Sequence, residues 1–97
     1  MPIHIYSEDT SVGTIDQICG DIWNLPEQVN TLEEWLAASQ PKLQPGKYVA
    51  DIGFIIRRNA TGGGAAIAPE MMRSMADLGM SLYLSEYPGE AEVEYED

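Results

Sequence analysis

Apolar and polar residues alternate in three parts of the chain, and this alternation predicts β-strands with one buried face. The longest run extends from Lys47 to Arg57. Its apolar positions fall at every second residue: Tyr48, Ala50, Ile52, Phe54 and Ile56. Shorter runs occupy residues 2–6 and 80–84. We therefore predict a first strand, a central strand and a last strand.

Two other segments combine helical spacing of apolar residues with signals for helix ends. The first begins at Thr31, an N-cap with Glu34 three residues later, and Pro41 stops it. The second has Pro69 at its first helical position and Gly79 at its C-terminal end. These signals predict two helices.

Residues 14–25 fit two structures. Apolar residues at positions 15, 18, 19, 22 and 23, with capping-box spacing from Thr14 to Gln17, favour an amphipathic helix. Gly20 costs such a helix about 1 kcal/mol. Residues 22–25, just before Pro26, also fit a strand. Helix and strand both stay open for this segment.

The order of the predicted elements defines a fold class. Residues 58–63 predict a turn, and Gly64 to Ala68 predicts the returning strand of a hairpin. The order is then strand, helix or strand, helix, strand, strand, helix, strand. It predicts an α+β domain with two or three helices on one face of a small antiparallel sheet, a split βαβ or ferredoxin-like arrangement. We place a single domain at residues 1–88 and an acidic C-terminal tail or edge strand at residues 89–97.

Several stretches of the chain resemble one bacterial family. They are residues 31–36, the strand from Tyr48 to Ile56, and above all the sequence from Gly62 through Pro69 to Leu82. A Leu-Glu-Glu helix opening, a glycine-rich turn, an Ala-Pro-Glu helix start and a Leu-Gly helix end are similar to the family catalogued as domain of unknown function 4279. The resemblance covers about residues 31–87. It implies the fold and a strand position for Trp23, but no activity, because the function of that family is not settled.

Composition suits one small domain. The chain has 97 residues, a mass of 10.7 kDa and 44% hydrophobic residues, enough for a thin core. The single cysteine, Cys19, excludes an internal disulfide. The longest apolar stretches, residues 54–56 and 65–68, are too short to span a bilayer, and no secretory signal pattern follows Met1. We expect a cytoplasmic protein that does not bind membranes.

The charge is strongly negative and unevenly distributed. The chain has 16 acidic and 5 basic residues and a formal net charge of -11. Six of the acids and none of the bases lie between Glu86 and Asp97. Nucleic acids and anionic membranes are bound through Lys and Arg, so this excess argues against both. It favours a basic partner and speeds its approach, although solubility alone accounts for the same charge.

No combination of residues specifies catalysis or metal binding. One histidine, His4, and one cysteine, Cys19, do not supply the three or four ligands of a zinc site. Neither has a catalytic partner near it in the sequence. Gly62-Gly63-Gly64 lacks the Lys-Ser/Thr of a phosphate-binding loop and fits a turn. We predict no catalytic residue, no metal and no cofactor.

Two further groups of side chains fit structural roles better than a site. Four methionines have spacing that favours core packing over an adaptable binding surface: Met71, Met72, Met75 and Met80. Three of the five bases suit ion pairs with the protein's own acids better than an anion site: Arg57, Arg58 and Arg73.

These observations favour a non-enzymatic protein-binding module of inhibitor or immunity type. Its partner would be a basic, nucleic-acid-handling bacterial protein, such as a toxin or a phage-defence protein. The predicted partner-binding residues are one aromatic residue and the acids near the C-terminus: Glu86, Glu90, Glu92, Glu94, Tyr95, Glu96 and Asp97. Two alternatives stay open: an adaptor that forms homo-oligomers through its sheet edge, and a small-ligand binder that uses the sheet face.

Overall fold

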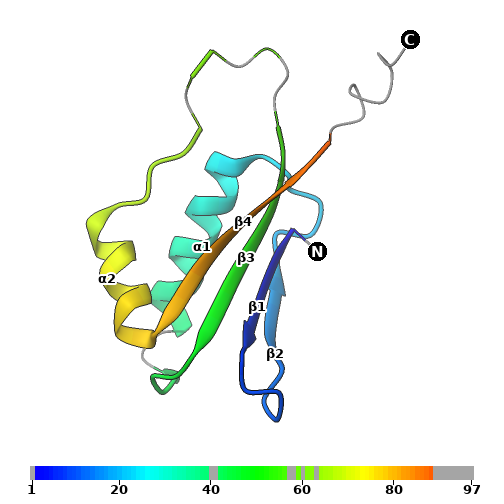
Figure 1. The fold of residues 1–97 in the computed structure, drawn as a ribbon. Helices are drawn as coiled ribbons and strands as arrows, with labels where there is room; N and C mark the ends of the chain where they lie inside the picture. The colour runs from blue at the N-terminus through cyan, green and yellow to red at the C-terminus, as the bar shows by residue number, and fades with distance from the viewer. Residues whose placement is uncertain (1, 40–41, 57–58, 60, 63, 89–97) are drawn as a thin grey trace.

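The computed structural model describes residues 2–39, 42–56, 59, 61–62 and 64–88. Its elements follow in the order β1 (Ile3–Ser7), β2 (Thr14–Ile18), α1 (Leu25–Ser39), β3 (Tyr48–Ile55), α2 (Pro69–Leu78) and β4 (Met80–Tyr87). The four strands form one sheet, and both helices lie on the same side of it (Figure 1). The α+β class and the placement of the helices on one face are confirmed.

The sheet is mixed, which corrects the prediction of an antiparallel sheet. The strand order is β2-β1-β3-β4. β1 pairs antiparallel with both β2 and β3, but β3 and β4 run parallel. α2 carries the chain back along the sheet between β3 and β4, so the two strands start at the same end (Figure 1).

The predicted strand at Gly64 to Ala68 is wrong. These residues form no strand and lead directly into α2. β3 already pairs with β1 on one side and with β4 on the other, so no free edge of β3 remains for a hairpin partner. The helix that follows is confirmed: α2 begins at Pro69, and Gly79 caps its C-terminus in the left-handed conformation.

Neither alternative for residues 14–25 holds as predicted, because the strand lies where the helix was favoured and residues 22–24 form no strand. Thr14–Ile18 is a strand, the backbone turns at Cys19 and Gly20, and α1 begins at Leu25. Thr31 is therefore not the N-cap. Asn24 takes that role, since its Oδ1 accepts a hydrogen bond of 3.1 Å from the Glu27 amide. Pro26 falls in the first turn of α1, where a missing N–H costs no helical hydrogen bond.

The core lies between the sheet and the two helices. β1 and β3 contribute Ile3, Ile5, Ala50 and Ile52, and the helices contribute Val29, Leu32, Leu36, Met71, Met75 and Leu78. Met80 completes this cluster, so three of the four methionines pack in the core as predicted. Met72 is the exception, because it points away from the sheet and is 51% exposed.

The end of α2 is fixed against the chain just before β3. The Gly46 amide donates to the Leu78 carbonyl at 2.9 Å, and the Tyr48 amide donates to the Gly79 carbonyl at 3.1 Å. Gly79 has φ 78, and a Cβ built on it would overlap the Gly46 carbonyl oxygen. Only glycine fits this position, because both the backbone angle and the close approach exclude a side chain.

We expect Gly79→Ala to lower the free energy of unfolding by about 2–4 kcal/mol, the sum of left-handed strain and steric overlap. Gly13→Ala is the matched control. Gly13 has φ +71, but a Cβ there meets nothing within 4 Å, so this variant should lose only the strain, about 1 kcal/mol. Urea denaturation measures both. Equal losses would show that the contact with Gly46 contributes nothing.

Candidate functional site

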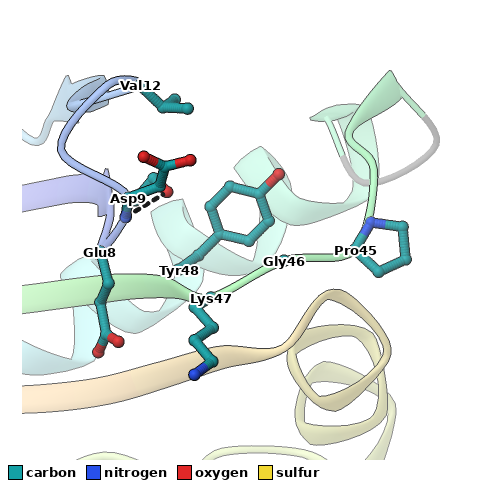
Figure 2. A pocket seen from close by; sticks show the side chains of 8 residues that line it. Glu8, Asp9, Val12, Pro45, Gly46, Lys47 and Tyr48 are labelled. Atoms are coloured by element: carbon teal, nitrogen blue, oxygen red, sulfur yellow. Dashed lines mark hydrogen bonds between the residues drawn. The ribbon is translucent and has the colours of Figure 1, made fainter.

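Two hollows flank the turn between β1 and β2. One, of about 570 Å³, lies between this turn and residues 45–48 (Figure 2). The other, of about 510 Å³, lies beside His4 and Tyr6. Ser7 and Glu8 line both hollows. Concave surface is therefore available on both sides of this turn.

The first hollow is lined mostly by groups that bind their own chain. The Ser11 amide and hydroxyl both donate to Asp9 Oδ1, at 3.0 and 2.7 Å. The Tyr48 hydroxyl donates to the Gln44 carbonyl at 2.6 Å. Figure 2 shows Asp9 and Tyr48 on one side of the backbone and Lys47 on the other. The arrangement holds the turn together.

Neither helix covers the other face of the sheet, which we call the open face. His4, Asp51 and Tyr83 are aligned across β1, β3 and β4 on this open face. The Ser85 hydroxyl donates to Asp51 Oδ1 at 2.7 Å. Tyr6 lies next to His4, with ring centroids 4.8 Å apart. A half-buried carboxylate thus sits among aromatic rings near the middle of the sheet.

The groups around Tyr6 affect its titration. Partial desolvation, and then the neighbouring Tyr83, Asp51 and Glu8, raise the pKa of Tyr6. Within the described residues, no Lys or Arg forms an ion pair with any of these carboxylates. Lys47 is the nearest cation along β3, and it precedes the strand. The open face is therefore aromatic and negative.

A second aromatic group lies at the far end of the open face. The Tyr87 ring occupies the space beside Gly53, where an added Cβ would meet Tyr87 Cε1 at 2.9 Å. Trp23 meets the same ring edge to face, with centroids 5.6 Å apart. Trp23 is not in a strand, contrary to the position that the family resemblance implied. Its carbonyl nevertheless accepts a hydrogen bond from the Ile55 amide at the end of β3.

The edge strand β4 exposes large apolar side chains. Tyr83 is 50% exposed, Leu84 54% and Tyr87 48%. Leu84 is aligned with the buried Ile52 on the helix side, yet neither helix covers it. β4 has no strand on its outer side in the described part of the chain. Its second half therefore presents exposed apolar side chains at an edge that no described strand covers.

Among the predicted site residues, the structure describes Glu86, which lies near the end of this strand. Glu86 is exposed on β4, aligned with Phe54 on the helix side of the sheet. The other predicted residues lie outside the described residues: Glu90, Glu92, Glu94, Tyr95, Glu96 and Asp97. Arg57, Arg58 and Gly63 lie outside them too. The sequence therefore predicted the acidic end of β4 but not Asp51, Tyr83 and Ser85.

The remaining candidates have structural surroundings. His4 Nε2 lies 2.8 Å from Thr14 Oγ1. Partial burial raises the pKa of the Cys19 thiol, with a smaller opposing effect from a hydrogen bond to Thr31, so the thiol stays protonated at neutral pH. Among the described residues, no three of His, Cys, Asp and Glu come together as a metal site. In the same residues, no helix has the length and apolar character needed to cross a membrane.

Comparison of the chain with known protein families, with curated proteins and with solved structures gave no match. The resemblance to the domain of unknown function 4279 family therefore stays a prediction, and the function rests on the residues themselves.

The Asp9 turn gives a prediction of pH dependence. The Ser11 hydroxyl, followed by the Ser11 amide, lowers the pKa of Asp9. A lowered acid pKa stabilises the fold above the unfolded pKa of about 4, and the effect disappears as pH falls through the folded pKa. Ser11→Ala should raise the pKa of Asp9 and destabilise the protein at pH 7, with a smaller difference in strong acid.

Carbonyl NMR titration of Asp9 and unfolding curves at several pH values measure these two effects. Thr10→Ala is the control, since Thr10 is an exposed residue of the same turn and should leave the pKa of Asp9 unchanged. An unaltered pKa in Ser11→Ala would show that its hydroxyl does not act on this carboxylate.

Proposed function

We propose that this chain is a non-enzymatic, cytoplasmic protein-binding module that covers a basic partner. One observation carries the proposal: the second half of β4 exposes Tyr83, Leu84 and Tyr87 beside Glu86, at a sheet edge that no described strand covers. Exposed apolar edge strands favour association, and partner proteins commonly cover them. The surrounding charge selects which partner does so.

The charge supports a basic partner over a second copy of the chain. The formal net charge of -11 makes two copies repel each other. The same charge attracts a basic protein and raises its association rate. A basic surface in bacteria commonly handles nucleic acid, so we propose the inhibitor or immunity type, directed at a toxin or a phage-defence protein. Tyrosines give such an interface large contact area at low entropic cost.

Affinity capture from bacterial lysate tests the proposal, with the full chain as bait and a variant carrying Tyr83→Ser and Leu84→Ser for comparison. We expect one basic protein to bind the full chain at low salt, to be lost in high salt, and to bind the variant weakly. Glu34→Gln, which alters an exposed acid on α1, is the control and should retain the partner. Retention that is equal for all three baits would contradict the proposal.

The purified pair then allows a kinetic test of the acidic end. Changing Glu92, Glu94 and Glu96 together to Gln should slow association and weaken its dependence on salt, because steering depends on charge and is screened by ions. Stopped-flow mixing at several salt concentrations measures the rate. An unchanged association rate would show that these glutamates do not steer the partner. Self-association of the chain, measured by light scattering, would then favour the oligomeric adaptor.

A further inference from the structure

The open face of the sheet contains a carboxylate with incomplete partners. Asp51 is half-buried on the central strand β3, between His4 of β1 and Tyr83 of β4. Ser85 donates one hydrogen bond to its Oδ1. No described cation pairs with it. A carboxylate has about four acceptor positions, so Asp51 keeps acceptor positions that no described residue uses.

The groups around Asp51 suit a flat cation. The Tyr83 side chain is aligned with Asp51 on the same face and is 50% exposed, so part of its ring is available for stacking. A guanidinium group donates several coplanar hydrogen bonds to a carboxylate and stacks on an aromatic ring. An ammonium group donates from a single nitrogen and does not stack flat on a ring, because it is a compact, strongly hydrated point charge. The pair of Asp51 and Tyr83 therefore favours arginine over lysine.

Fixed neighbours make this geometry ready for binding. The Ser85 hydrogen bond orients the Asp51 carboxylate before any ligand arrives. Tyr87 packs at Gly53 and against Trp23, which fixes the adjacent part of β4. Binding then costs little side-chain entropy at Asp51.

We propose that Asp51, Ser85 and Tyr83 form a subsite on the open sheet face that binds an arginine side chain of a partner protein. This inference rests on the proposed function, since it names the side chain by which the basic partner is recognised. The acidic end of the chain attracts any basic protein, whereas this subsite distinguishes arginine from lysine.

Two blocked peptides of equal charge test the subsite, one alternating arginine with threonine and the other alternating lysine with threonine. Amide NMR titration of the full chain at physiological salt measures both. We expect the arginine peptide to bind more tightly and to shift the amides of Asp51, Tyr83 and Ser85 most. Attraction by net charge alone predicts equal affinities and shifts spread over the acidic residues, and that result would overturn the proposal.

Variants separate the two parts of the subsite. Asp51→Asn should weaken binding of the arginine peptide about tenfold, because it removes a charged hydrogen bond. Tyr83→Leu, which keeps an apolar side chain, should weaken it about two- to fivefold. Both variants should change the affinity of the lysine peptide less than that of the arginine peptide. Glu34→Gln is the control, because Glu34 is an exposed acid of α1, on the other side of the sheet from Asp51.

The outcomes distinguish this proposal from the function on which it rests. If the captured partner binds wild type and Asp51→Asn equally, the subsite is wrong and the protein-binding function stands. If no partner is captured while the arginine peptide binds at Asp51, the subsite stands and the assigned function is wrong. Absence of any shift at Asp51, Tyr83 and Ser85 with the arginine peptide overturns the subsite directly.

Discussion

Close packing around Gly53 is the constraint on which the rest of this structure depends. Its amide donates to the Pro2 carbonyl, which fixes the start of β1. Its carbonyl accepts a hydrogen bond of 2.7 Å from Gln28 Nε2, which fixes α1. The space left by its missing side chain holds the Tyr87 ring of β4. Three elements are thus positioned by one buried residue of the central strand.

Gln28 extends this constraint from the core to the open face. It is fully buried, and its Nε2 also donates to the Ile22 carbonyl at 2.8 Å. This bond holds the segment before α1 beside the end of β3, where Trp23 reaches the Tyr87 ring. Its Oε1 has no partner among the described atoms, and a buried acceptor without a partner costs about 1–3 kcal/mol. The two hydrogen bonds from Nε2 therefore fix the side-chain amide of Gln28 despite the free-energy cost of its unpaired Oε1.

Local signals in the sequence predicted some elements well. The alternation from Tyr48 to Ile56 and the Pro69 and Gly79 signals depend on neighbouring residues only, so β3 and α2 appeared where expected. The start of α1 was wrong because Thr31 and Glu34 have the spacing of a cap, while Asn24 acts as one before a proline. Alternation also does not indicate which strands pair. The parallel pairing of β3 with β4 is therefore seen only in the structure.

The same distinction explains what could be foreseen of the candidate site. The acidic end from Glu86 onward is a run of neighbours, so composition revealed it. Asp51 and Tyr83 are 32 positions apart in the sequence and become neighbours only through strand pairing. Nothing in the sequence around either residue marks it, since a lone carboxylate and a lone tyrosine are common on any strand.

The two proposed surfaces act over different distances, and this difference decides what each contributes. Charges on the acidic end act over about one Debye length, roughly 8 Å at physiological salt, so they raise the rate of encounter with any basic surface. They cannot distinguish among cations. Asp51 acts only in contact, where Ser85 and Tyr83 limit the shape of the cation that fits. Under the two proposals, the chain obtains fast association from its composition and selectivity from strand pairing, and the second depends on the packing at Gly53.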